Sequence, residues 1–299
     1  MVRLAIVADT PQGDSLAALV PRIAGAEVVL REATLEQLVA GGMADVDAVV
    51  LLSKESPDVC QQVVDAGKHL LVSLNSQFST EAIQALSDQC QQQKVCLMVA
   101  GSDRLRPALQ ATWPSLAAGE LGDPGLVRLH RWSSTGANGA GLPGDLLRDL
   151  DLVLNVFKSL PSEVYAITRS VAGAEEPDYI QIHLGFAGGG MAVIDRAATL
   201  PPGDGYFSFS VIGSAGAVYA DDHLNKQLVF RGQHPVAVGT ESGDLAAVAD
   251  LQEFCQAIEQ QRVARMSGAD WLAAVKTAEM IRESIGACSA VRSGEGGAS

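Results

Sequence analysis

The first third of the chain alternates short apolar runs with stretches in which apolar residues recur at helical spacing. The helical spacing predicts two helices, at residues 56–67 and 79–94. Gly67 supplies the C-terminal stop of the first helix, and Ser79 is the N-cap of the second. The apolar runs predict β-strands at residues 2–8, 27–32, 46–53, 69–74 and 95–101. Because strands that alternate with helices favour parallel pairing, this part predicts a Rossmann-like, doubly wound parallel sheet of the α/β class.

The second half has a different order, because several strands follow one another without intervening helices. The pattern predicts strands at residues 126–132, 163–171, 178–187, 189–199, 206–213 and 216–221, and helices at residues 142–160, 244–262 and 268–286. This succession favours an α+β domain with a large, mainly antiparallel sheet. We therefore divide the chain into a Rossmann-like domain at 1–121, an α+β domain at 122–288 and a mobile tail at 289–299.

Composition and charge narrow the classes of function. Of the 299 residues, 47% are hydrophobic and 19% are charged, which is typical of a globular protein. The formal net charge of −14 argues against binding nucleic acid, which requires clustered Lys and Arg. No stretch approaches the roughly 20 apolar residues of a membrane span, and the apolar run at the start is short for a signal peptide. The five cysteines lack metal-ligand spacing, so we expect reduced thiols, no metal and a cytoplasmic location.

A doubly wound sheet binds its ligands beside the carboxyl ends of its strands. In this chain that edge contains residues 8–13, 53–57 and 73–75. Candidate binding residues for a small molecule are therefore expected in these three loops.

Several stretches occur in an order that resembles a known family. They are "SPDVCQQVVDAGKHLLV", "STEAIQAL" and "VCLMVAGSDRLRPALQ" in the first half, then "LRDLDLVLNVF", "IHLGFAGGGMAVID" and "FSVIGSAGAVYADD". Together they resemble the glucose-fructose oxidoreductase and inositol dehydrogenase (Gfo/Idh/MocA) family over residues 1 to about 288. The resemblance implies NAD or NADP as cofactor, a sugar, polyol or related small-molecule substrate, and a homodimer or homotetramer formed through the sheet of the second domain.

The first candidate cofactor loop departs from the family pattern. The resemblance implies a GxGxxG turn after the first strand, where this chain has "ADTPQG" and keeps only Gly13. Thr10 is β-branched, and Pro11 lacks an N–H group that could donate to a pyrophosphate. Alternatively, Thr10 caps the first helix and Pro11 occupies its first position, where proline is well tolerated. Asp9, Thr10 and Gly13 are the candidate cofactor residues here, and we expect NAD and NADP to bind weakly.

Further candidate cofactor residues follow the next strands. Arg31 stands where the resemblance implies an acidic residue, and it either contacts the 2′-phosphate of NADP or is simply solvated. Ser53 and Lys54 replace a Thr-Pro-Asn type of turn, and Lys54 either holds an anionic ligand or is solvated. Ser73 and Asn75, at the end of the fourth strand, complete this set.

The resemblance also implies a lysine that moves a proton at the end of the fourth strand, in a Glu-Lys-Pro sequence. Ser73, Leu74 and Asn75 occupy those places. Leu74 has no group that can accept or donate a proton, and Ser73 and Asn75 are poor proton acceptors at neutral pH.

A second proton-transfer residue is missing as well. The Asp-x-x-x-His-x-x-Asp pattern of the family aligns with Gly144, Arg148 and Asp151, and an arginine stays protonated at pH 7. Arg148 and Asp151 can pair on one helix face. His183 either faces the substrate or is a hydrogen-bonded strand histidine. The candidate substrate-pocket residues are therefore Arg104, Arg148, Asp151 and His183, and we assign no catalytic residue.

Two hypotheses follow from these observations. The first is a non-catalytic binding or regulatory protein that keeps the family fold. The second is a divergent, active NAD(P)-dependent oxidoreductase that acts on a sugar, polyol or related hydroxyl compound.

Overall fold

The computed structural model describes residues 1–8, 10–32, 34–52, 56–74, 78–134, 145–170, 177–201, 205–221, 226–230, 235–239 and 243–293. The chain forms two compact units. The first unit comprises Met1–Leu105 and Ser242–Val275, and the second comprises Arg106–Glu241 and Lys276–Ser299. This division differs from the predicted one, because residues 106–121 belong to the second unit and residues 242–275 to the first.

The first unit contains a five-stranded sheet in the order β2-β1-β3-β4-β5. Its strands are β1 (Val2–Val7), β2 (Ala26–Glu32), β3 (Ala48–Leu51), β4 (His69–Ser73) and β5 (Leu97–Ala100). Its helices are α1 (Thr10–Leu19), α2 (Leu35–Gly41), α3 (Pro57–Asp65), α4 (Thr80–Gln93), α7 (Gly243–Glu259) and the first part of α8 (Gly268–Ala287), with 3-10 turns η1 (Val20–Arg22) and η2 (Asp103–Leu105). Every neighbouring pair is parallel, which confirms the predicted doubly wound sheet.

Local signals in the sequence set the helix ends of this unit. The Ser79 side chain accepts a hydrogen bond from the backbone N–H of Ala82 and caps α4, as predicted. Gly67 follows α3 with a φ of 69°, a left-handed conformation that glycine adopts without steric cost. Both helices therefore lie within the predicted ranges.

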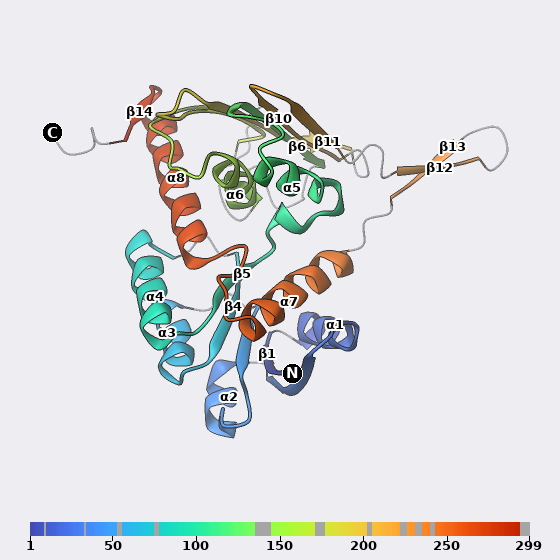
Figure 1. Ribbon diagram of the computed structural model, residues 1–299, viewed down its shortest axis with the longest axis vertical. Helices are drawn as coiled ribbons and strands as arrows, with labels where there is room; N and C mark the ends of the chain where they lie inside the picture. The colour runs from blue at the N-terminus through green and yellow to red at the C-terminus, as the bar shows by residue number, and fades with distance from the viewer. Residues whose placement is uncertain are drawn as a thin grey trace. The chain divides into compact units, whose positions relative to one another are not determined.

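The core of the first unit explains why α7 belongs to it. Leu4 and Ile6 of β1 pack in one buried cluster with Leu251, Phe254 and Ala257 of α7. In Figure 1, α1 and α7 cover one face of the parallel sheet, and α3 and α4 cover the other. Packing between segments distant in sequence, rather than chain continuity, determines the composition of this unit.

The second unit is built on a seven-stranded sheet in the order β11-β10-β6-β9-β8-β7-β14. The strands are β6 (Pro124–Ser134), β7 (Glu163–Arg169), β8 (Tyr179–Gly185), β9 (Met191–Leu200), β10 (Tyr206–Gly213), β11 (Ala217–Asp221) and β14 (Val291–Arg292). All neighbours are antiparallel except β6 and β9, so the mainly antiparallel sheet is confirmed. A separate two-stranded sheet consists of β12 (Lys226–Phe230) and β13 (Pro235–Gly239).

Helices cover one face of the seven-stranded sheet (Figure 1). They are α5 (Thr112–Ala117), α6 (Asp145–Phe157) and the second part of α8, with the 3-10 turn η3 (Pro107–Leu109). Side chains alternate along the strands, so that Ile182 is buried whereas Met191, Tyr165 and Tyr219 are exposed on the open face. The second unit therefore has one buried and one open sheet face.

Part of the tail predicted at residues 289–299 pairs with the seven-stranded sheet. Val291 and Arg292 pair with β7 as the edge strand β14, and the N–H of Ser293 donates to the carbonyl of Ser162 at 2.9 Å. Main-chain pairing at a sheet edge does not require apolar side chains, so the low apolar content did not reveal it. Residues 294–299 lie outside the described residues.

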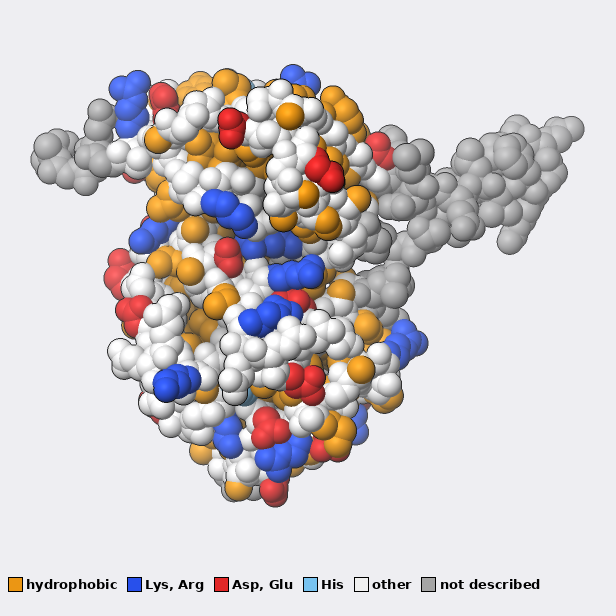
Figure 2. All heavy atoms as spheres, in the orientation of Figure 1, with side chains coloured by type: hydrophobic (Ala, Val, Ile, Leu, Met, Phe, Trp, Pro, Cys, Tyr) orange, Lys and Arg blue, Asp and Glu red, His pale blue; other side chains and the backbone are white. Residues whose placement is uncertain are grey.

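Charged side chains are mixed on the surface. On the face of the first unit drawn in Figure 2, basic and acidic side chains are interspersed and do not form a basic field. Across the part of the chain that the structure describes, no helix combines the length and apolar character needed to cross a bilayer.

Candidate functional site

The segment after β1 leads directly into α1. Thr10 is the first residue of this helix and Pro11 is the second, so Pro11 lies in the first turn. The buried Gly13 comes close to β1, since a Cβ atom there would lie 3.5 Å from the Ala8 Cβ. That distance is an ordinary van der Waals contact, so an alanine would fit at this position. Asp9 lies outside the described residues.

Arg31, at the end of β2, is tied to α1. Its Nη1 donates to Asp14 Oδ1 at 2.9 Å, and both side chains are more than half exposed. A 2′-phosphate that contacted Arg31 would therefore compete with the Asp14 carboxylate. At this exposure the ion pair contributes little to stability.

The ends of β3 and β4 are described only in part. Ser73 is the last residue of β4 and pairs with Ala100 of β5, and both Ser73 and Leu74 are half-buried. Ser53, Lys54 and Asn75 lie outside the described residues. At the described end of β4 the polar side chain is that of Ser73, and Leu74 beside it is apolar.

Arg104 stabilises the first unit from within. It is buried in η2, and its Nη2 donates to Asp270 Oδ1 at 3.0 Å while its Nη1 donates to the carbonyl of Arg265. Asp270 also accepts hydrogen bonds from the backbone N–H and hydroxyl of Ser267, the residue before α8. Burial disfavours the charged carboxylate, but the charge of Arg104 and these hydrogen bonds outweigh it, so the pKa of Asp270 lies below its usual range. Arg104 thereby fixes the start of α8.

In the second unit, α6 carries a buried carboxylate that the sequence pattern did not single out. Asp149 is fully buried and accepts from Arg131 Nε at 2.7 Å through Oδ1 and from Arg196 Nη1 at 3.1 Å through Oδ2. Arg131 and Arg196 are register partners on β6 and β9. Asp151 is also fully buried, and Arg148 is half-buried. We call Asp149, Arg131 and Arg196 the buried ion cluster.

An aromatic ring adjoins this cluster. The guanidinium carbon of Arg131 lies 4.9 Å from the centroid of the Phe207 ring, and that of Arg106 lies 4.6 Å from it. Such cation–π contacts favour a cation over the ring face. The available signal was an arginine at an inward-facing strand position, as in "LHRW" and "VIDRA", where the alternate residues are apolar.

His183 does not join Arg148 and Asp151. It lies on β8 between the buried residues Ile182 and Leu184, and its own side chain is exposed. Because side chains alternate along a strand, His183 lies on the open face of the sheet, opposite α6. Its ring contacts Tyr165 on that face, at 6.4 Å between centroids.

Among the described residues, no three His, Cys, Asp or Glu side chains are grouped so that they could hold a metal ion. The absence of a metal stays a prediction.

Comparisons with solved structures match nearly the whole chain. A putative myo-inositol dehydrogenase from Sinorhizobium meliloti 1021 matches with a TM-score of 0.84 and 20% identity over 98% of this chain and 99% of that chain. A probable dehydrogenase from Thermotoga maritima matches with a TM-score of 0.83 and 16% identity over 97% and 98%. The scyllo-inositol dehydrogenase from Lactobacillus casei with bound NAD(H) and scyllo-inositol has a TM-score of 0.79 and 18% identity over 98% and 99%. At these identities the likeness shows the fold.

Comparisons of the sequence with curated proteins and with family models gave different results. No curated protein matches the chain. The family model described as "Oxidoreductase family, C-terminal alpha/beta domain" of Gfo/Idh/MocA matches residues 115–287, which is more than half of the chain. The chain therefore belongs to the Gfo/Idh/MocA oxidoreductase family.

Proposed function

We propose that this protein is a non-catalytic member of its family that binds a small molecule without oxidising or reducing it. The observation that carries the proposal is Leu74, a half-buried apolar side chain directly after β4. The family resemblance assigns this place to the lysine that polarises the substrate hydroxyl. A leucine supplies neither a charge nor a proton acceptor, and general acid–base help contributes a factor of about 10² to 10⁴.

The cofactor edge supports the proposal independently. The first turn of α1 contains Pro11, which removes one backbone donor from the place where a pyrophosphate is usually held. Arg31 is paired with Asp14. The described residues at this edge therefore fit a dinucleotide poorly, and weak binding of NAD and NADP follows.

The second candidate function is a divergent, active NAD(P)-dependent oxidoreductase that acts on a sugar, polyol or related hydroxyl compound. It is favoured by the match, over almost the full length of both chains, to a dehydrogenase with bound NAD(H) and scyllo-inositol. In this case another side chain, with Lys54 as the first candidate, would have to accept the proton.

Calorimetry and turnover assays separate the two functions. NAD and NADP would be titrated into the wild type, and reduction of both would be followed over a panel of sugars, inositols and sugar acids. The variants are Lys54→Ala, Leu74→Lys and, as a control that keeps position 74 apolar, Leu74→Met. We expect no wild-type turnover and no binding in the low-micromolar range.

Enzymatic turnover by the wild type would contradict the proposal. Wild-type turnover that Lys54→Ala abolishes and Leu74→Met leaves intact would overturn the non-catalytic proposal and assign the base to residue 54. Turnover gained only by Leu74→Lys would support the proposal, because it would show that the proton acceptor was the missing part.

We further propose that the protein forms a homodimer or homotetramer through the open face of the seven-stranded sheet. Met191 on β9 is 53% exposed and Tyr219 on β11 is 74% exposed, and Tyr165, Ile167 and Tyr179 are exposed on the same sheet. Exposed apolar groups on one sheet are typical of a surface that a partner covers.

A further inference from the structure

The first unit contains a pocket of about 750 Å³ at the amino-terminal edge of its sheet. His69 begins β4 and Leu97 begins β5, and both line the pocket. Because ligands of doubly wound sheets bind at the carboxyl edge, this pocket is separate from the predicted cofactor edge. Its volume falls within the range of about 300 to 1,000 Å³ that is usual for small-molecule sites.

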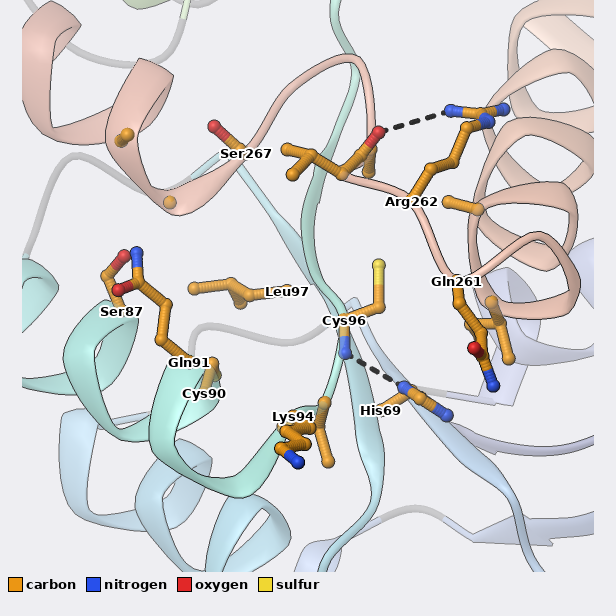
Figure 3. Close-up of a pocket in the computed structure, with 17 residues that line it drawn as sticks. His69, Ser87, Cys90, Gln91, Lys94, Cys96, Leu97, Gln261, Arg262 and Ser267 are labelled. Carbon is orange, nitrogen blue, oxygen red and sulfur yellow. Dashed lines mark hydrogen bonds between the residues drawn. The ribbon is translucent and has the colours of Figure 1, made fainter.

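Three parts of the first unit form the walls of the pocket (Figure 3). One face of α4 and its C-cap contributes Ser87, Cys90, Gln91 and Lys94. The end of α7 and the chain that follows it contribute residues 257–258 and 261–264, and the start of α8 contributes residues 267–269. The α8 wall is closely packed, since a Cβ atom on Gly268 would lie 2.9 Å from both Leu97 Cδ2 and Ser87 Oγ.

His69 presents a hydrogen-bond donor. Its Nδ1 accepts from the backbone N–H of Cys96 at 2.8 Å, as the dashed line in Figure 3 shows. Burial lowers the pKa of His69, so the ring is neutral at pH 7. With Nδ1 occupied as an acceptor, the single ring proton lies on Nε2.

The remaining lining is mostly apolar and uncharged. Burial raises the pKa of Cys90 to about 12 and that of Cys96 to about 11, so both thiols stay protonated at neutral pH. They adjoin an apolar surface made of Val95, Leu97, Ala257, Ile258, Val263, Ala264 and Ala269.

The charge of the pocket is positive in a protein with a net charge of −14. Of the described residues that line it, none is Asp or Glu. Arg262 is compensated, because its Nη1 and Nη2 donate to the buried Glu253 at 2.6 and 3.0 Å. Lys94 forms no ion pair or hydrogen bond through its ammonium group within the described residues, so it leaves one positive charge at the pocket.

We propose that this pocket binds a small carboxylic acid with an apolar body. The carboxylate pairs with the Lys94 ammonium, and the apolar body packs on Leu97 and Ala264. The opposing explanation is that Lys94 only offsets the partial negative charge at the end of α4. That role predicts a change in stability on substitution without any effect on a ligand. The proposal does not depend on the proposed function, because it involves neither cofactor nor turnover.

The test uses benzoate as the probe and benzamide as its uncharged analogue. Both are titrated at pH 7 and low salt into the full chain, and binding is followed by calorimetry and by ligand-observed NMR. We expect saturable binding of benzoate and weaker binding of benzamide. Lys94→Gln should weaken benzoate about two- to fivefold, the range that an exposed ion pair supports. Lys276→Gln, at an exposed position of α8 outside the pocket, should leave binding unchanged.

A blocking variant locates the site. Ala269 is exposed at the rim, so Ala269→Trp should fill the pocket with little effect on folding, which circular dichroism checks. It should abolish binding of benzoate and of hexanoate, an aliphatic acid titrated in parallel. The proposal is overturned if neither acid binds the wild type, or if binding is the same in Lys94→Gln and Ala269→Trp as in the wild type.

Discussion

The hydrogen bond between His69 and Cys96, at the starts of β4 and β5, depends on pH. Burial lowers the pKa of His69, and protonation of Nδ1 would remove the hydrogen bond from Cys96 that joins β4 to β5. Asp47 favours the charged ring and Lys68 opposes it, but burial dominates. The charge of His69 is therefore unfavourable in the folded state.

The sign of the pH dependence follows from this shift. In the unfolded chain a histidine titrates near about 6.5, so below that pH the unfolded state binds more protons than the folded state. The contribution of His69 to stability is complete above about pH 6.5 and is lost as the pH falls through the lower, folded pKa. We expect His69→Gln to flatten the decline of the free energy of unfolding below pH 6.5, measured by urea denaturation at several pH values. His183→Gln, on the open sheet face, serves as the control, and equal slopes for both variants would contradict the assignment.

For single residues of the candidate site, the sequence predicted some positions and missed others. The family pattern drew attention to Arg148 and Asp151, which lie on one helix. The carboxylate that forms ion pairs with two strands is Asp149, which contacts Arg131 of β6 and Arg196 of β9, elements far apart in the chain. The periodicity of a helix or a strand predicts which of its side chains point inward. It does not predict which strand packs against which helix, because that depends on the order of the strands in the sheet.

At the scale of elements, the buried ion cluster holds α6 against the sheet. Asp149 is fully buried, and both of its arginine partners are at least 86% buried by side chain. Removing one member of such a cluster leaves charges uncompensated in a medium that solvates them poorly. We expect Asp149→Asn to lower the free energy of unfolding by about 3 to 5 kcal/mol.

Chemical denaturation with a constant m-value measures this effect. Asp195→Asn provides the matched control, because Asp195 lies one residue before Arg196 on β9 and points to the open face. A loss below about 1 kcal/mol in Asp149→Asn would mean that the two arginines are solvated in the folded protein.

Elements with a clear apolar pattern were predictable from sequence. Apart from β14, the strands of the two larger sheets and the helices α3, α4, α6, α7 and α8 lie close to their predicted ranges, because apolar residues recur in them at the period of the element. α2 and α5 have 7 and 6 residues, and β14 has 2, so none of them shows a full pattern. β14 depends on pairing with β7, which is distant in sequence.

At the scale of the whole molecule, the open face of the seven-stranded sheet determines the expected assembly. We expect light scattering at micromolar concentration to give the mass of a dimer or a tetramer. Met191→Asp should shift that mass toward the monomer, because it places a charge in a surface that a partner would bury. Leu160→Asp, at a 45% exposed position outside the strands, should not. A monomeric wild type would rule out assembly through this face.

The discontinuous first unit imposes an order on synthesis. β1 leaves the ribosome long before α7, since Leu251 and Phe254, which cover it, follow only after residues 106–241 have been made. Until then the nascent chain presents the apolar side of β1 to water while the strands β6 to β11 of the second unit are being translated. This is the interval in which chaperones recognise exposed apolar segments. A product that stopped before residue 242 would keep that surface open permanently, and it would be removed by proteolysis rather than accumulate as a folded fragment.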